Sequence, residues 1–300
     1  MTFDCAIVGG GPAGLNAALV LGRARRNVVL FDDGNPRNAV TRESHGFITR
    51  DGIEPGEFRR IAHRDISKYS SVQARRATIV SISRAFPASF QLVSQQGELF
   101  QARKVILATG LKEELPAVSG LRDYYGKSLF NCPYCDGWEL RDMPLIVISE
   151  GPQAFHMAKT LFNWSKRLAV CTNGQAAVTR EQKVLLEMKG IAVFERKIDE
   201  LSGSNGALEK VVFEDGVEFA CKGGFVTPRS VLVSSFGQSL GCMTNALGGI
   251  VTDEFGRTNI EGVYAAGDAS VVAPSQVIIA AGEGSRAAIG VNSDLTNEDF

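Results

Sequence analysis

Two closely spaced cysteines are the residues in this sequence most able to do chemistry. They are Cys132 and Cys135 in the stretch NCPYCDGWE, and Asp136 follows directly. Thiols at this spacing suit a redox-active disulfide or half of a metal site. A CxxC pair lowers the pKa of one thiol, which raises the thiolate fraction that can attack a disulfide. A neighbouring carboxylate opposes this by repulsion, so Asp136 suits a proton shuttle better than an activator. Its alternative role is a helix N-cap or a solvent-facing acid.

A metal site is the weaker interpretation of the cysteine pair. Structural zinc sites need about four ligands, usually two such pairs or one pair with two histidines. The chain has no second CxxC, and its three histidines are not at ligand spacing. The residues therefore favour a redox disulfide and predict no metal. The other four cysteines are isolated and are expected to be small buried hydrophobic residues: Cys5, Cys171, Cys221 and Cys242.

The composition indicates a globular protein with balanced charge. The 300 residues suggest about two domains, and 44% of them are hydrophobic. Lys and Arg number 32 against 33 Asp and Glu, which predicts no nucleic-acid partner. No apolar run reaches the roughly 18–20 residues that span a bilayer, and the start MTFDCAIVGGG lacks a signal-peptide pattern. We therefore expect a cytoplasmic protein with no membrane partner, in which a close cysteine pair is more often catalytic than structural.

A glycine-rich turn lies close to the start of the chain. Residues 4–8 predict a strand, GGGPAG follows, and a helical stretch leads to a second strand ending at Asp32. Gly9 allows the tight turn, Gly11 lets the backbone approach a pyrophosphate, and Gly14 lets the helix pack on the strand. Asp32 can accept hydrogen bonds from a ribose diol, and its charge opposes a 2′-phosphate. In this context the glycines predict a dinucleotide site.

Segments far apart in the sequence belong to one predicted domain. KVILATG at 104–110 and GVYAAGDAS at 262–270 predict strands that end in small-residue turns, and a helix starts near Ser275 or Gln276. Between them, residues 144–172 repeat the strand, turn, helix and strand. We therefore predict the α/β class, with two Rossmann-like three-layer domains of which the second is inserted in the first. The predicted boundaries are 1–112 and 234–300 for the discontinuous FAD-binding domain, and 113–233 for the inserted NAD(P)-type domain with the CxxC.

Four motifs in this order resemble the low-molecular-weight thioredoxin reductase family. They are GGGPAG, ILATG, CPYCDG at the start of the insert, and GVYAAGDAS with a following glutamine. The stretches DDGNPRN and HGF are similar to a branch that includes reductases of small dithiol metabolites. The resemblance implies FAD in the outer domain and a homodimer. It also implies a thioredoxin-like protein, or a small disulfide or dithiol, as the substrate.

The resemblance also assigns roles to single residues. Cys135 would be the flavin-proximal thiol, Cys132 the thiol that exchanges with substrate, and Asp136 the acid/base. Asp268 would bond the ribityl chain, and the helix from about Gln276 would point its positive end at the flavin ring. The FAD-binding residues that the motifs predict are Gly9, Gly11, Pro12, Ala13, Gly14, Asp32, Ala108, Thr109, Gly110, Gly267, Asp268, Gln276 and Val277.

The insert departs from the family pattern at its own dinucleotide turn. That turn reads ISEGPQA, with Ser149 at the first glycine position and Glu150 where a pyrophosphate would approach. CTNG after the next strand offers no arginine for a 2′-phosphate. Two interpretations stay open: a weak NADPH site, or a domain without pyridine nucleotide that binds a second FAD or serves a ferredoxin-type donor. Glu150 favours the second.

The predicted function is an FAD-dependent dithiol/disulfide oxidoreductase, resembling thioredoxin reductase, with a degenerate NADPH site. One alternative is a dithiol oxidase that forms a disulfide in a small metabolite, with oxygen as acceptor. Another is a non-catalytic flavin-binding protein, which the intact CPYCD argues against.

Overall fold

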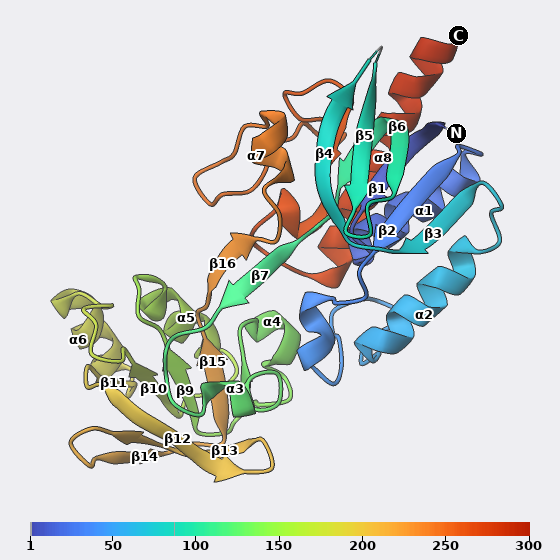
Figure 1. Cartoon of the computed structure of the whole chain (residues 1–300). Helices are drawn as coiled ribbons and strands as arrows, with labels where there is room; N and C mark the ends of the chain where they lie inside the picture. Colours follow the sequence, from blue (N-terminus) through green and yellow to red (C-terminus); the bar gives the residue numbers. More distant parts are fainter. Residues whose placement is uncertain (1, 87) are drawn as a thin grey trace. The chain divides into compact units, whose positions relative to one another are not determined.

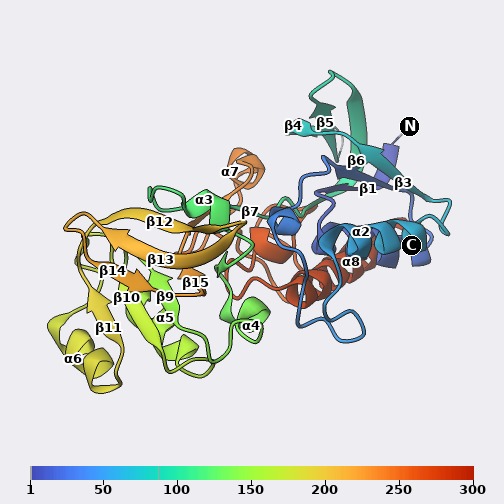
Figure 2. The same cartoon turned by 90° about the horizontal axis from the view of Figure 1, so that it is seen from below.

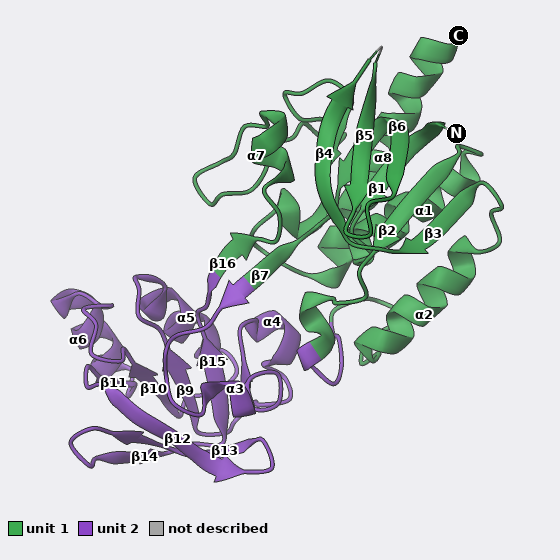
Figure 3. Cartoon of the chain, in the orientation of Figure 1, with its two compact units in different colours: residues 1–39, 46–112, 230–300 green, residues 40–45, 113–229 purple. Residues whose placement is uncertain are grey.

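The computed structural model describes residues 2–86 and 88–300, which form two compact units. Figure 3 shows unit 1, residues 1–39, 46–112 and 230–300, and unit 2, residues 40–45 and 113–229. The chain passes between the units through β7 (Leu111–Glu114) and β16 (Arg229–Leu232), which pair with each other. The predicted fold class is confirmed, since unit 2 is inserted in unit 1 and each unit holds a parallel sheet of Rossmann type.

Unit 1 is built on a seven-stranded sheet that contains the strands β3-β2-β1-β6-β5-β4 in this order (Figure 1). The seventh strand, β17, pairs with β6. The strands β1, β2, β3, β6 and β17 run parallel, whereas β4 and β5 form an antiparallel arm. The strand bounds are Thr2–Val8 (β1), Val28–Asp32 (β2), Val72–Arg76 (β3), Ile79–Ala85 (β4), Ser89–Ser94 (β5), Leu99–Leu107 (β6) and Val263–Ala265 (β17).

Three helices cover one face of the parallel strands in unit 1, as Figure 2 shows. They are α1 (Pro12–Arg23), α2 (Pro55–Ile66) and α8 (Val277–Asp299). Both faces of the strands are apolar because both are covered: Cys5 and Ile7 point to the helices, whereas Phe3 and Val8 join the opposite core. The short helices of this unit are η1 (Arg37–Val40), α7 (Phe236–Leu240) and η2 (Gly267–Ala269).

Unit 2 has a parallel five-stranded sheet of order β11-β10-β9-β15-β8 and an antiparallel three-stranded sheet, β12-β13-β14. The strands are β8 (Leu129–Phe130), β9 (Leu145–Ile148), β10 (Leu168–Cys171), β11 (Ala192–Phe194), β12 (Ile198–Ser204), β13 (Ala207–Phe213), β14 (Glu218–Ala220) and β15 (Gly223–Val226). The helices are α3 (Leu121–Tyr124), α4 (Pro133–Asp136), α5 (Gln153–Leu161) and α6 (Arg180–Met188). The N-terminus of α6 carries a capping box between Thr179 and Gln182.

Two further expectations can be compared with the structure. The four isolated cysteines are all buried and unpaired, as expected from their apolar surroundings. Among the described helices, none combines the length and the apolarity needed to cross a membrane.

Candidate active site

Cys132 and Cys135 form a disulfide at the start of α4. Cys132 is the N-cap of this single-turn helix, and its carbonyl oxygen accepts hydrogen bonds from the backbone N–H of Cys135 and of Asp136, both at 3.1 Å. Pro133 occupies the first helical position, where no N–H is needed. The local sequence thus folds both thiols onto one turn, with their Cα atoms 5.3 Å apart.

Asp136, which directly follows Cys135 in the chain, is buried and has a perturbed pKa. Burial, followed by the negative charge of Glu139, raises the pKa of its carboxyl to about 7, while the charge of His45 acts in the opposite direction. A carboxyl with such a pKa holds or releases a proton near neutral pH, which a proton shuttle requires. The two predicted cysteines are therefore bonded to each other. The buried environment of Asp136 suits the acid/base role that the family resemblance implies.

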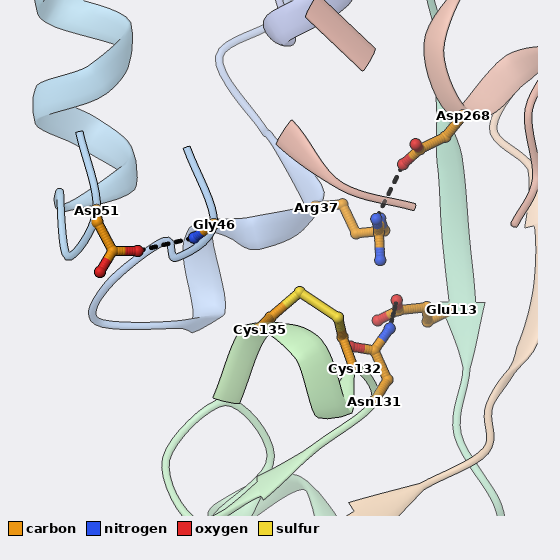
Figure 4. Close-up of a disulfide and its surroundings, with 8 residues drawn as sticks. All are labelled: Arg37, Gly46, Asp51, Glu113, Asn131, Cys132, Cys135 and Asp268. Atoms are coloured by element: carbon orange, nitrogen blue, oxygen red, sulfur yellow. Dashed lines mark hydrogen bonds and ion pairs between the residues drawn. A yellow bond between two sulfur atoms is a disulfide. The ribbon is translucent and has the colours of Figure 1, made fainter. Parts of the chain in front are cut away.

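Asn131, the residue before the cysteine pair, belongs to a partly buried hydrogen-bond network that the sequence did not indicate. Asn131 donates from Nδ2 to Glu113 at 2.5 Å (Figure 4). The Tyr125 hydroxyl donates to the other oxygen of Glu113 at 2.6 Å. Glu113 lies in β7, and no motif links it to the cysteines. The network orients the backbone that enters Cys132.

Exposed aromatic side chains border the cysteine turn within unit 2. Tyr134 and Trp138 are 68% and 65% exposed. The Tyr134 ring packs edge-on against Trp164, with centroids 5.5 Å apart, and the Arg141 guanidinium lies 4.1 Å from the centroid of Trp138. Such rims supply apolar contact area to a bound partner.

The glycine turn of unit 1 has the geometry of a pyrophosphate site. Gly9 has φ +119°, and a Cβ there would lie 2.1 Å from the carbonyl oxygen of Ala108. A Cβ on Gly14 would lie 1.8 Å from the carbonyl oxygen of Gly9, so helix and strand pack too closely for any other residue. A Cβ on Gly11, the N-cap of α1, would meet no atom within 4 Å, which leaves the helix N-terminus open to a ligand. The turn therefore fits a dinucleotide such as FAD.

Asp32 lies at the end of β2, as predicted, and both oxygens of its carboxylate interact with other groups of the protein. Oδ1 accepts from the N–H of Gly34 at 2.8 Å, and Oδ2 accepts from Arg59 at 2.5 Å and lies 3.4 Å from Nε2 of His63. Burial alone would raise the pKa of Asp32, but hydrogen bonds from His63, Gly34 and Arg59 hold it below its usual value. The Nε of Arg59 is buried without a hydrogen-bond partner among the described residues.

A cavity of about 440 Å³ opens beside this carboxylate. It is lined by Asp32, Gly34, Arg59, His63, Ala74, Arg75 and Arg76. Sequence reasoning missed Arg59 and His63, because they lie on α2 and no spacing rule connects them to Asp32. A second hollow, about 490 Å³ and lined by residues 115–123, contains none of the predicted site residues.

The other predicted cofactor residues also lie in unit 1, at the carboxyl ends of its parallel strands. Ala108, Thr109 and Gly110 follow β6, and Gly267 and Asp268 follow β17. The structure brings these segments together, since β17 pairs with β6. A Cβ on Gly267 would also lie 2.7 Å from Cβ of Ala13 in α1. The remaining predicted residues open the helices α1 and α8: Pro12, Gln276 and Val277.

Asp268 has a partner that the sequence did not predict. Its Oδ2 accepts from Nη2 of Arg37 at 2.9 Å (Figure 4). Arg37 opens the short helix η1 after β2. The one available signal was the stretch DDGNPRN, which includes this arginine.

In the dinucleotide-type turn of unit 2, the acidic residue Glu150 is held by a hydrogen bond. Glu150 accepts from Nδ2 of Asn173 at 2.6 Å, and Asn173 in turn accepts from the N–H of Ile198 at 3.0 Å. Ser149 is fully buried and accepts from the hydroxyl of Thr227 at 2.6 Å. The carboxylate therefore lies at the carboxyl end of β9, where a pyrophosphate would approach the start of α5.

Comparison with known proteins agrees with this geometry. The model of the pyridine nucleotide-disulphide oxidoreductase family matches residues 3–284. The chain belongs to this family. A protein named thioredoxin reductase aclD from Aspergillus oryzae is 31% identical over 99% of this chain and 98% of its own length. The resemblance to low-molecular-weight thioredoxin reductases is therefore confirmed.

Two further relatives of this thioredoxin reductase-like chain extend the comparison. A candidate thioredoxin reductase, TrxB, from Bacillus anthracis has a solved structure with a TM-score of 0.96 and 46% identity, covering 99% of this chain and 100% of that one. A protein from Arthroderma benhamiae, named as a thioredoxin reductase, is 42% identical, but the match spans 49% of this chain and 37% of that protein. The chain is a flavin-dependent disulfide oxidoreductase of the thioredoxin reductase-like group, and membership of the family implies FAD binding.

Proposed function

We propose that the chain moves electrons between FAD held in unit 1 and a substrate dithiol or disulfide through Cys132 and Cys135. The observation that carries this proposal is the disulfide at the start of α4, followed directly in the chain by the buried Asp136. Bound FAD would supply the two-electron redox chemistry. The residues that would hold it are those of the glycine turn and strand ends: Gly9, Gly11, Pro12, Ala13, Gly14, Asp32, Ala108, Thr109, Gly110, Gly267, Asp268, Gln276 and Val277.

The chain's own residues would carry out the thiol exchange. Reduction of the Cys132–Cys135 bond takes up two electrons and two protons, and Asp136 would deliver one of these protons from its carboxyl. The Cys132 thiolate would then attack a substrate disulfide and form a mixed disulfide. The substrate S–S bond breaks in this step, and its second sulfur leaves as a thiolate that takes up a proton. Cys135 would attack the Cys132 sulfur, release the substrate as a thiol and restore the bond. The same steps in reverse oxidise a dithiol.

The substrate that we favour is a thioredoxin-like protein or a small dithiol or disulfide. Relatives named thioredoxin reductase support the first, and the exposed aromatic rim of Tyr134 and Trp138 suits either. A dithiol oxidase with oxygen as acceptor remains the second candidate, because the carboxylate of Glu150 disfavours a nicotinamide donor. In this proposal the enzyme is a homodimer in the cytoplasm.

We further propose that unit 2 does not use NADPH as its main electron donor. Glu150, held by Asn173, would repel a pyrophosphate, and the residues after β10 offer no arginine for a 2′-phosphate. The donor would be a ferredoxin-type carrier, or a second FAD would occupy this turn.

The test is a count of released cofactor together with an anaerobic titration. We expect FAD in the purified protein, bleaching of the flavin by a dithiol, and no rapid bleaching by NADPH. Close to two flavins per chain would assign the turn of unit 2 to a second FAD. Rapid bleaching by NADPH would overturn the proposal about the donor, and flavin that no dithiol can reduce would overturn the proposed redox role.

A further inference from the structure

An ion pair joins Arg37 and Asp268 within unit 1. Nη2 of Arg37 donates to Oδ2 of Asp268 at 2.9 Å, and the two side chains point toward one another in Figure 4. The Arg37 side chain is 28% exposed and that of Asp268 is 17% exposed. Both residues belong to unit 1, although 231 positions separate them in the sequence. Water and salt screen such a partly buried pair less than a pair on the open surface.

The backbone that carries Asp268 is fixed by a tight turn after β17. Gly267 has φ +68°, and its carbonyl oxygen accepts from the N–H groups of Ser270 and Val271, both at 2.9 Å. A Cβ on Gly267 would lie 2.7 Å from Cβ of Ala13, which belongs to the first turn of α1. The turn therefore places the backbone of Asp268 next to the helix N-terminus that fits a pyrophosphate.

Arg37 brings a positive charge to a predicted cofactor site that otherwise has acidic residues. It opens η1, which follows β2 in the chain. None of the residues predicted to hold FAD is a lysine or an arginine, whereas Asp32 and Asp268 are acids. Arg59 from α2 is a partner of Asp32, and Arg37 is a partner of Asp268. Each acid of the predicted site is thus paired with an arginine from another element.

A carboxylate close to a bound flavin opposes reduction of that flavin. Asp268 is expected to bond the ribityl chain, which is attached to the flavin ring. Reduction of a flavin by two electrons and one proton adds one negative charge, and a nearby carboxylate disfavours this change by repulsion. A guanidinium in contact with the carboxylate offsets the repulsion, and it keeps its charge over the whole working range of pH.

We propose that Arg37 is a positioning residue for the cofactor: it orients the Asp268 carboxylate and balances its charge, so that an acid can bond the ribityl chain without disfavouring reduction of the flavin. The pair acts on the redox potential of the flavin through its net charge, which is zero when both residues are present. The inference rests on the proposed FAD site in unit 1 and on the expected role of Asp268.

The test measures reduction of the flavin apart from that of the cysteine pair. In a Cys132→Ser/Cys135→Ser background only the flavin takes up electrons. An anaerobic dithionite titration with a reference dye then gives the ratio of reduced to oxidised flavin at a fixed potential. We expect Arg37→Gln to lower this ratio about tenfold, which corresponds to about 30 mV for a two-electron couple. Arg37→Lys, which keeps the charge, stays within about threefold of the background protein.

The opposite change and the double variant test the balance of charge. Asp268→Asn raises the ratio, because the charge of Arg37 is then unbalanced. Arg37→Gln combined with Asp268→Asn has no net charge again, so the ratio returns to within about threefold of that of the background protein. Arg60→Gln on α2 is the matched control. The Arg60 side chain is 62% exposed and paired with Glu57, and its loss changes the ratio by less than about twofold.

Several outcomes would contradict the inference. An unchanged ratio in Arg37→Gln overturns it, and so does a double variant whose ratio is as low as that of Arg37→Gln alone. A ratio in Arg37→Lys as low as that in Arg37→Gln also overturns it, because the charge is kept. If Arg37→Gln retains no flavin, the rise expected for Asp268→Asn decides in its place. A background protein that binds no FAD would contradict the proposed FAD site itself, so the two failures are distinguishable.

Discussion

Replacing Arg59 by methionine tests whether the carboxylate of Asp32 depends on its cationic partner. Arg59 donates to Asp32 at 2.5 Å, and the Asp32 side chain is only 12% exposed. Removing one partner of a buried pair costs about 3–5 kcal/mol, but the bonds from Gly34 and His63 remain and soften the loss. We expect Arg59→Met to lower the free energy of unfolding by about 2 kcal/mol, close to the value of one hydrogen bond to a charged group.

The pH dependence of this loss follows from the direction of the pKa shift. The pKa of Asp32 is lower in the folded protein than in the unfolded chain, so its interactions stabilise the fold above the unfolded pKa of about 3.9. That stabilisation disappears as the pH falls through the folded pKa. The loss in free energy of unfolding caused by Arg59→Met is therefore largest at neutral pH and becomes smaller once Asp32 is protonated.

Arg60 provides the matched control on the same helix. Its partner Glu57 is one turn away, and the Arg60 and Glu57 side chains are 62% and 39% exposed. Screening by water makes such a pair nearly neutral for stability. Urea unfolding of both variants, followed by circular dichroism at neutral and acidic pH, gives the comparison. Equal stability of Arg59→Met and Arg60→Met at neutral pH would refute this account of Asp32.

Three further predictions concern the cysteine turn and the cofactor turn. Cys135→Ser keeps its flavin but loses bleaching by a dithiol, as followed by anaerobic absorbance; bleaching at the wild-type rate would contradict the assigned role. Asp136→Asn slows dithiol-dependent flavin reduction by about a hundredfold and removes the pH dependence near 7 from the rate, because the carboxyl with a pKa of about 7 is gone. Gly14→Ala places a Cβ 1.8 Å from the carbonyl oxygen of Gly9, so the purified variant contains little flavin, and a wild-type flavin content would show that the turn can relax.

The sequence alone determined the elements whose geometry depends on near neighbours. The spacing of Gly9, Gly11 and Gly14 predicts a tight strand-to-helix turn because a side chain at Gly9 or Gly14 would collide with nearby backbone. The CxxC spacing predicts two thiols on one turn, and the structure joins Cys132 to Cys135. Parallel apolar strands ending in small residues predicted the sheet edge where the cofactor motifs meet. These rules act over a few residues, so a single chain can display them.

Only the tertiary structure decided which charged groups face the predicted residues. Arg59 engages Asp32 and Arg37 engages Asp268, although no spacing rule pairs them. His45 reaches Glu139 because residues 40–45 pack with a unit that otherwise starts at residue 113. The pKa of Asp136 depends on this packing, since burial and the surrounding charges act through space. Packing between segments far apart in the sequence sets the distances between these charged side chains. Local sequence patterns do not contain those distances, so they could not be predicted.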